Sequence, residues 1–158
     1  MTTPTSFDER AFRDALGRFA TGVTIVTCNG PDGPMGITAN SFASLSLDPP
    51  LVLWSPAKSS RRYGAFVNAS EFAIHIASYD QLEQCRDFAK SAGGSKDTEW
   101  KKSATGCPYL QGGVARFMCE QHATFEGGDH TIIVGKVVDF QKLQGSPLIY
   151  CNGTYNRG

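Results

Sequence analysis

The chain has 158 residues, long enough for one domain to bury most of its chain surface in a core. Its 15 Lys and Arg residues balance its 15 Asp and Glu residues, which excludes the clustered positive charge of a nucleic-acid-binding face. No apolar run approaches the ~20 residues of a membrane span. We therefore expect one domain over residues 1–158 that has neither nucleic acid nor a membrane as a partner.

The cysteines and the first residues indicate where such a protein resides. Five cysteines are scattered singly and form no C-x-x-C pair, which argues against both a zinc site and a disulfide framework. The first residues lack the basic and then apolar pattern of a signal peptide. We expect a soluble protein of the reducing cytoplasm, in which Cys28, Cys119 and Cys151 lie within apolar strands as small hydrophobes.

The first quarter of the chain predicts one helix and one hairpin. Residues 6–9, Ser-Phe-Asp-Glu, have the spacing of a capping box, and the helix that they open is expected to end at about residue 19. The β-branched residues 23–28 predict a strand. The Gly- and Pro-rich residues 29–34 predict a turn into a second strand at 35–39.

The middle of the chain predicts strands that are interrupted by short helices. Strands are expected at residues 41–47, 51–55 and 72–76, and helices at about 61–67 and 81–90. Residues 91–108 are polar and rich in glycine, so we expect a long loop there. Long loops in compact domains are usually functional or packed on a partner.

The last third of the chain predicts the longest strands, at residues 115–125 and 131–143, joined by a Gly-Gly-Asp-His turn. A final strand follows at 148–151. Strands, turn signals and few helices together predict a mainly β, barrel-like architecture. The chain lacks the regular alternation of strands and helices that a doubly wound nucleotide fold requires.

Residues 35–50 are the most distinctive segment. Its small and polar side chains are those of Thr38, Ala39, Asn40, Ser41 and Ser44. Side chains this short let backbone N–H and C=O groups approach a flat, hydrogen-bonding ligand. An edge strand followed by a Ser- and Asn-rich turn explains the same composition without any ligand.

A second segment, Pro-Ala-Lys-Ser-Ser-Arg-Arg at 56–62, precedes a predicted short helix. Ser59 or Ser60 can cap that helix, and positive charge gathers at its start on Lys58, Arg61 and Arg62. Free N–H groups, hydroxyls and cations together suit a phosphate. An ordinary capped surface helix with solvated arginines is the alternative.

The turn between the two longest strands supplies a third candidate. Its glycines are explained by turn geometry, whereas Asp129 and His130 are not required by a turn. The imidazole at this position can hydrogen-bond a carboxamide, although a lone histidine is more often a bystander. His75 and His122 lie within strands and are expected to be structural.

Taken in order, these segments resemble the flavin reductase-like family, whose fold is the FMN-binding split barrel. The resemblance is carried by Gly36-x-Thr38-Ala39-Asn40-Ser41-Phe42-x-Ser44-Leu45-Ser46, Asp48-Pro49-Pro50, Lys58-Ser59-Ser60, Gly128-Asp129-His130 and Pro147-Leu148-x-Tyr150-x-x-Gly153-x-Tyr155. It covers nearly the whole chain. It implies a split β-barrel of about six or more antiparallel strands with a few flanking helices.

The resemblance also implies an activity. Members of the family are NAD(P)H:flavin oxidoreductases that pass a hydride from the nicotinamide to FMN or FAD and supply reduced flavin to a separate monooxygenase. Such a transfer needs no protein acid or base, because the flavin carries the chemistry. FMN and FAD, like NADH and NADPH, stay open as alternatives. A flavin-binding module that stores or senses flavin without turnover is the alternative from another class.

The implied site follows residue by residue. The ring edge would lie along Thr38, Ala39, Asn40, Ser41 and Ser44, and the phosphate would lie at Ser55, Lys58, Ser59, Ser60 and Arg61. Asp129 and His130 would position the nicotinamide, and Phe88 and Tyr155 complete the implied set. The resemblance implies a homodimer with flavin near the interface, to which the partner subunit would bring residues 88–89 and 91–108.

Overall fold

The computed structural model describes residues 6–158, so the expectation about the first residues, 1–5, lies outside the described part. Seven strands form one antiparallel sheet. They are β2 (Thr24–Gly30), β3 (Gly33–Ala39), β4 (Ala43–Leu47), β5 (Pro50–Trp54), β6 (Glu71–Ile76), β9 (Ala115–Gly127) and β10 (His130–Lys142). Their order in the sheet is β3-β2-β6-β9-β10-β5-β4.

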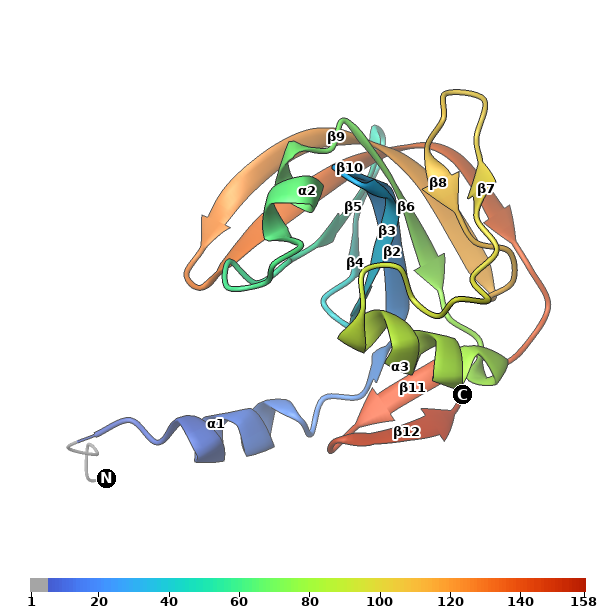
Figure 1. Cartoon of the computed structure of the whole chain (residues 1–158). Coiled ribbons are helices and arrows are strands. Elements are labelled where there is room, and N and C mark those ends of the chain that lie inside the picture. The colour runs from blue at the N-terminus through green and yellow to red at the C-terminus, as the bar shows by residue number, and fades with distance from the viewer. Residues whose placement is uncertain (1–5) are drawn as a thin grey trace.

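This order explains why the sheet curls into a barrel. β3 and β4 are its two opposite edges, yet only residues 40–42 connect them. So short a link spans at most about 14 Å, so the sheet must bend until its edges approach each other. Figure 1 shows the resulting curved, partly closed barrel. The predicted mainly β split barrel is confirmed.

The other elements surround this barrel. β1 (Thr21–Gly22), β11 (Leu148–Cys151) and β12 (Thr154–Arg157) form a small sheet, and β7 (Lys101–Lys102) pairs with β8 (Pro108–Tyr109). The helices are α1 (Glu9–Leu16), α2 (Tyr63–Asn68) and α3 (Leu82–Lys90), the last preceded by a 3-10 turn at Tyr79–Gln81. Among the described residues no helix has the length and apolar character needed to cross a bilayer.

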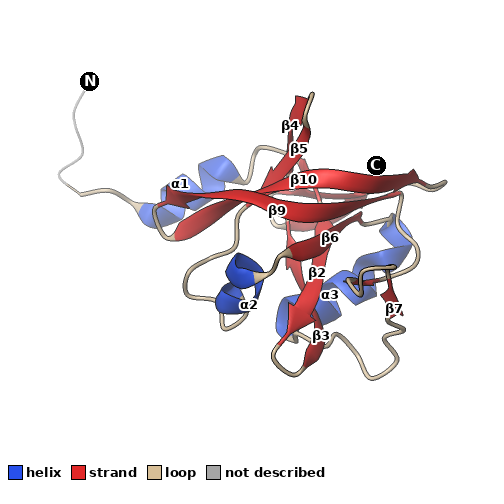
Figure 2. Ribbon diagram, turned by 90° about the horizontal axis from the view of Figure 1, so that it is seen from above, coloured by secondary structure: helices blue, strands red, loops and turns tan. Residues whose placement is uncertain are grey.

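Two hydrophobic clusters lie on the two faces of β2, because side chains alternate along a strand. Val26 and Cys28 enter the cluster inside the barrel, whereas Val23, just before the strand, and Ile25 enter the cluster beneath α3. Figure 2 accordingly shows α2 and α3 on different sides of β2. The barrel cluster is centred on Trp54, whose ring meets that of Phe66 edge-on at 5.1 Å.

All five cysteines are free. Cys28 and Cys119 are buried as predicted, and so are Cys85 and Cys107, whereas Cys151 is only partly buried. Burial raises the pKa of the Cys28 and Cys85 thiols to about 12. The pKa of the Cys107 and Cys119 thiols is raised to about 12 for the same reason. These four side chains are therefore neutral packing groups at physiological pH.

The N-terminal helix differs from its prediction at both ends. Its N-cap is Asp8, whose carboxylate accepts a hydrogen bond from the Ala11 N–H at 3.1 Å, in place of Ser6. Asp caps a helix as well as Ser does, and here it stands two residues closer to the helical residues. The helix ends at Leu16 rather than at about residue 19. It buries none of its residues, and Figure 1 shows it standing away from the barrel.

The loop expected at residues 91–108 packs against its own chain. Ala92 accepts a hydrogen bond from the Gly36 N–H at 2.8 Å, and Pro108 accepts one from the Thr27 hydroxyl at 2.6 Å. Cys107 and Leu110 are buried. Part of the loop thus covers the core of this subunit, which follows from its two short strands, β7 and β8, and could not be read from its polar composition.

Candidate functional site

The end of β3 lines a cavity at the barrel edge. Thr38, Ala39 and Asn40 form one wall, and Tyr155 of β12 lies in the lining. The volume of this cavity is about 220 Å³, and its remaining lining residues are Val23, Ala89 and Tyr150. The structure thus brings together Thr38, Ala39, Asn40 and Tyr155 of the implied site. It adds Val23, Tyr150 of the C-terminal motif, and Ala89, which the resemblance assigned to the partner subunit. We call this space the β3-edge cavity.

The backbone of β3 faces this cavity because β3 is an edge strand. At Gly36 both main-chain groups point outward: the N–H donates to Ala92, and the carbonyl accepts from the Arg62 guanidinium at 3.0 Å. Backbone groups alternate in direction along an antiparallel strand, so Thr38 presents its N–H and C=O on the same outer edge. These groups give the wall one donor and one acceptor for a ligand.

The side chains of the wall serve the fold instead. The Thr38 hydroxyl donates to the carbonyl of Cys85 in α3 at 2.5 Å, which holds the helix against the strand. The Thr24 hydroxyl donates to the carbonyl of Ala39 at 2.7 Å. The small residues of the wall therefore leave backbone, rather than hydroxyl groups, to face the cavity.

Ser41 connects the wall to the opposite edge of the barrel. Its hydroxyl accepts a hydrogen bond from the Ser55 N–H at 2.9 Å and donates to the Ser55 carbonyl at 3.3 Å. Ser44 lies further on, exposed in β4 opposite Val52, and outside the lining of the β3-edge cavity. Ser41 is the residue that closes the barrel next to the candidate site.

The segment that follows Ser55 runs along the turn that contains His130. The Lys58 N–H donates to the Asp129 carbonyl at 2.9 Å, and the Thr131 N–H donates to the Pro56 carbonyl at 3.1 Å. The two segments that the sequence singled out, at 56–62 and 128–130, are therefore in direct contact. Ser41 and Ser55 link this second group to the wall of the β3-edge cavity.

One ion pair and one hydrogen bond engage the polar side chains of this group. The ammonium of Lys58 lies 2.5 Å from the Glu126 carboxylate, and this hydrogen bond raises the pKa of Lys58. The Asp129 carboxylate lies 2.7 Å from Nδ1 of His130, and this hydrogen bond lowers the pKa of Asp129. Within residues 6–158 the other ring nitrogen of His130, Nε2, has no hydrogen-bond partner. It is the atom of this turn that a ligand can engage.

The arginines before α2 have different roles, and Arg62 is neither solvated, as the surface-helix alternative required, nor free for a phosphate. The Arg62 guanidinium is half-buried and donates to the carbonyls of Gly36, Phe88 and Ala89, and burial lowers its pKa. It holds the end of α3 against β3 and is not free to bind phosphate. The Arg61 side chain makes no hydrogen bond or ion pair with the described residues, so its charge remains for a ligand.

The serines before α2 also divide their roles. The Ser60 hydroxyl accepts a hydrogen bond from the Arg62 N–H at 3.2 Å, and α2 begins at Tyr63, a little later than predicted. Ser60 thus orders the loop ahead of the helix. The hydroxyl of Ser59 has no partner within the described chain.

Phe88 does not lie where a ligand could contact its ring. The side chain is fully buried, meets the Trp100 ring edge-on at 5.7 Å, and packs closely over Gly36. Helical periodicity turns its exposed neighbour, Ala89, toward the β3-edge cavity. Of residues 88–89, which the resemblance assigned to the site, Ala89 therefore lines the cavity of its own subunit, whereas the Phe88 ring packs in the core.

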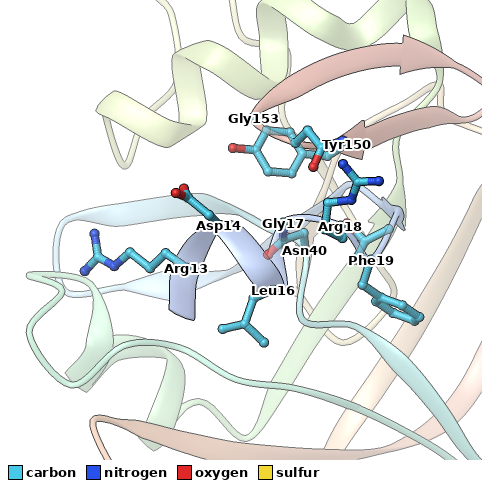
Figure 3. Close-up of a pocket in the computed structure, with 11 residues that line it drawn as sticks. Arg13, Asp14, Leu16, Gly17, Arg18, Phe19, Asn40, Tyr150 and Gly153 are labelled. Carbon is cyan, nitrogen blue, oxygen red and sulfur yellow. The ribbon is translucent and has the colours of Figure 1, made fainter. Parts of the chain in front are cut away.

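A larger cavity, of about 510 Å³, adjoins the first (Figure 3). It lies between the end of α1, with Arg13, Asp14 and Arg18, and the β11–β12 turn. The Asn152 N–H donates to the Gly17 carbonyl at 2.8 Å, which holds the turn against the helix end. Asn40 and Tyr150 line both cavities, so the two spaces are neighbours. We call this larger space the α1 groove. Asn40, Tyr150 and Gly153 in its lining belong to the sequence motifs, whereas no motif indicated its α1 residues.

The two cavities suit a nucleotide better than a small metabolite. The β3-edge cavity alone is below the range of about 300–1,000 Å³ that is typical of ligand sites, and the α1 groove is within it. Backbone groups at the edge can hydrogen-bond a flat heterocycle, and tyrosine rings can stack on it. Unpaired arginines can bind phosphate. The fold is a split barrel, and its edge carries a candidate site for a nucleotide.

Comparison with known proteins gives the family. Residues 16–158 match the model of the flavin reductase like domain, and the chain belongs to that family. It is 49% identical over 154 residues to the FMN reductase (NADH) SmoA of Agrobacterium fabrum, covering 98% of this chain and 88% of the relative. It is 43% identical over 148 residues to the reductase component of a flavin-dependent trigonelline monooxygenase of Acinetobacter baylyi, covering 92% of this chain. The chain spans only 48% of that relative's length, and 49% of a probable flavin reductase of Rhizobium meliloti.

Solved structures show the same fold. The flavin reductase PheA2 in its native state matches with a TM-score of 0.88 at 32% identity, over 96% of this chain and 99% of that chain. The NADH:FAD oxidoreductase SgcE6 of Streptomyces globisporus, in complex with NAD and FAD fragments, matches with a TM-score of 0.88 at 34% identity, over 96% and 93% of the two chains.

Proposed function

We propose that this protein is an NADH-dependent flavin reductase that reduces FMN by hydride transfer and supplies reduced flavin to a separate monooxygenase. The observation that carries the proposal is the link between the open backbone edge at Thr38, through Ser41 and Ser55, and the turn that presents His130. The names of the relatives support it: SmoA is an FMN reductase that uses NADH, and others are reductase components of monooxygenases.

The residues of the β3-edge cavity bind and orient the flavin in this proposal. The N–H and C=O of Thr38 and the amide of Asn40 bond the polar edge of the ring, and Tyr155 contributes an aromatic face. Flavin, when bound, supplies the hydride-accepting chemistry. Backbone donors that are fixed in advance stabilise the negative charge that reduction places on that edge.

The segment after Ser55 binds the flavin phosphate in this proposal. Arg61 supplies a free guanidinium, and Ser59 and Ser60 supply hydroxyls, whereas Lys58 is partly neutralised by Glu126. Arg61→Ala should weaken FMN binding roughly tenfold, because a hydrogen bond to a charged group contributes about 1.5–3 kcal/mol. Riboflavin binding should be unchanged. An equal loss for FMN and riboflavin, measured by quenching of flavin fluorescence, would place the phosphate elsewhere. Arg10→Ala, which removes an exposed guanidinium on α1 that lines neither cavity, is the control.

His130 is a positioning residue in this proposal. Because Asp129 holds Nδ1, the ring is oriented by its neighbour and offers Nε2 to the carboxamide of the nicotinamide. His130→Ala should therefore raise the KM for NADH about tenfold while the flavin dissociation constant stays unchanged. A fall in flavin affinity with no change in KM would contradict this role.

Steady-state oxidation of NADH in the presence of free FMN tests the activity itself. The purified protein should accelerate the loss of NADH absorbance far above the rate without protein. NADPH and FAD, assayed in parallel, determine the preferred nucleotide and flavin. Binding of FMN without any acceleration by NADH or NADPH would instead support the storage or sensing module.

We also propose a homodimer. α1 is amphipathic, and its apolar side chains Phe12 and Leu16 are exposed to 48% and 57%, with Phe19 beyond them at 78%. An isolated helix of eight residues with an uncovered apolar face is marginal in water, so a second copy of the chain is the occupant that this face suits. Light scattering should give twice the mass of one chain, and the double variant Phe12→Ser and Leu16→Ser should shift that mass toward the monomer.

A further inference from the structure

Arg62 connects three parts of the proposed site, although it lines neither the β3-edge cavity nor the α1 groove. Its guanidinium donates to the Gly36 carbonyl of β3 at 3.0 Å, and to the carbonyls of Phe88 and Ala89 in α3, the second of these at 3.3 Å. Its backbone ends the segment at 56–62, directly before α2. One side chain thus joins that segment to β3 and α3, which both contribute to the lining of the β3-edge cavity.

The carbonyls that Arg62 contacts on α3 are those that the helix itself leaves without a partner. The last four carbonyls of an α-helix have no intrahelical N–H, and Phe88 and Ala89 belong to the last turn of α3, which ends at Lys90. These carbonyls also form the negative end of the helix dipole, which favours a cation. Arg62 therefore caps α3 from a position 26 residues before Phe88 in the chain.

Hydrogen bonds, rather than a counter-ion, stabilise this guanidinium. Among residues 6–158 Arg62 forms no ion pair, and burial lowers its pKa. A half-buried cation is costly unless its N–H groups are satisfied, so the three carbonyls determine where the side chain can lie. The Arg62 backbone N–H also donates to the Ser60 hydroxyl at 3.2 Å. Residues 60–62 are thereby fixed in position relative to β3 and α3.

FMN makes this relative position important. Its ring and its phosphate are joined by one ribityl chain, so both can bind at once only if their two subsites are correctly spaced. In the proposed function the ring lies against Thr38, and the phosphate lies at Ser59, Ser60 and Arg61. Riboflavin has the same ring without the phosphate, so its binding does not depend on the spacing.

We propose that Arg62 is a positioning residue that sets the spacing between the ring wall and the phosphate segment, and thereby determines the preference for FMN over riboflavin without contacting the phosphate. This inference rests on the proposed function, since it takes the segment at 56–62 as the phosphate site. It differs from a structural role of Arg62, because the loss of a packing contact alone would weaken both flavins equally.

The measured quantity is the dissociation constant of riboflavin divided by that of FMN, which we call the FMN preference. Quenching of flavin fluorescence gives both constants on the full chain. Arg62→Gln should lower the FMN preference roughly tenfold, toward its value in Arg61→Ala. Arg62→Lys should lower it as far, because an ammonium keeps the charge but cannot reproduce the planar fork of donors. If the Lys variant keeps the wild-type preference while the Gln variant loses it, the charge acts directly on the phosphate and the proposal is wrong.

Thr38→Val is the matched control. It removes another hydrogen bond between β3 and α3, from the Thr38 hydroxyl to the Cys85 carbonyl, but one that does not involve the segment at 56–62. This variant should weaken riboflavin and FMN by the same factor and leave the FMN preference within twofold of the wild type. If Arg62→Lys behaves in the same way as Thr38→Val, Arg62 is only structural and the proposal is overturned.

The double variant of Arg61→Ala with Arg62→Lys separates positioning from direct contact. If Arg62 acts by placing Arg61, the double variant should show the FMN preference of Arg61→Ala within about twofold, because the second change has nothing left to misplace. Losses that multiply would make Arg62 an independent phosphate ligand and contradict the proposal.

Two further outcomes distinguish this inference from the proposed function. A wild-type protein that binds neither flavin contradicts the proposed function. A wild-type protein that prefers FMN, with an unchanged preference in Arg62→Lys, leaves the flavin site in place and refutes only the role of Arg62. Near-ultraviolet circular dichroism shows which variants are folded before each titration, and Arg62→Lys decides the question alone if Arg62→Gln does not fold.

Discussion

His75 should make the stability of this protein fall steeply in mild acid, and replacing it should remove that fall. The side chain is fully buried in β6. Its Nδ1 lies 2.8 Å from the Ile25 carbonyl, which can only accept, so Nδ1 carries the proton; its Nε2 accepts the N–H of Leu110 at 2.9 Å. A second proton would place two N–H groups against each other. The neutral ring is therefore fixed by its partners.

The size of the effect follows from the pKa. Burial, reinforced by the nearby charge of Arg116, lowers the pKa of His75 from 6.5 to about 4. Because the folded-state pKa lies below the unfolded one, the unfolded chain takes up the proton first. The stabilisation is complete above pH 6.5 and is lost as the pH falls toward 4. The loss from this group is about 2 kcal/mol at pH 5 and approaches about 3 kcal/mol below pH 4.

Urea unfolding at pH 7 and at pH 5 measures this loss. His75→Gln does not titrate, yet its amide can still donate to Ile25 and accept from Leu110. Between pH 7 and pH 5 the wild type should therefore lose about 2 kcal/mol more than this variant. His122→Gln, at an exposed position of β9, should behave as the wild type does. Equal losses in the wild type and His75→Gln would refute the reasoning, as would an NMR titration that places the pKa of His75 in the wild type near 6.5.

Three further substitutions test the packing around the site, each by its change in the free energy of unfolding. Gly36→Ala would place a Cβ 2.8 Å from the Phe88 ring and should cost about 1–3 kcal/mol, whereas Gly64→Ala, with nothing within 4 Å, should be neutral or stabilising. Arg62→Lys should cost about 1–3 kcal/mol, because an ammonium cannot reproduce the guanidinium contacts to three carbonyls; an unchanged stability would mean that these contacts do not hold α3. Ser41→Ala should cost about 1–3 kcal/mol, because it leaves the Ser55 N–H without its acceptor, while Ser44→Ala should be silent.

The strands were predictable because their signals are local. The hairpin of β2 and β3 follows from a β-branched strand and the Gly- and Pro-rich turn after it, although the two strands extend to Gly30 and Gly33, further into the turn than predicted. The two longest strands follow from the Gly-Asp-His turn in the same way. Helix ends were less predictable, because Asp and Ser are equally favoured as N-cap residues, and both Asp8 and Ser6 stand near the start of α1.

The roles of single side chains at the site depended on contacts between distant segments. Arg62 and Arg61 are chemically identical in the sequence, yet only Arg62 meets backbone carbonyls 26 and 27 residues away. Phe88 and Ala89 are adjacent in α3, and only the packing of the helix decides which of them faces the cavity. The arginines of the α1 groove look like those of any surface helix until the β11–β12 turn is placed beside them.

The Thr-Ala-Asn-Ser sequence of the wall suggests direct ligand contacts, but in the structure its hydroxyl groups hold the fold around the cavity. Thr38 bonds α3 and Ser41 bonds Ser55. These two bonds hold α3 against β3 and close the barrel edges, so they fix the position of the backbone groups that face the cavity. Replacing either hydroxyl should therefore disturb binding through the position of the backbone, and the loss of affinity should follow the loss of stability. A residue that contacts ligand directly, as proposed for Arg61, should lose affinity with no loss of stability, and this contrast separates the two kinds of role.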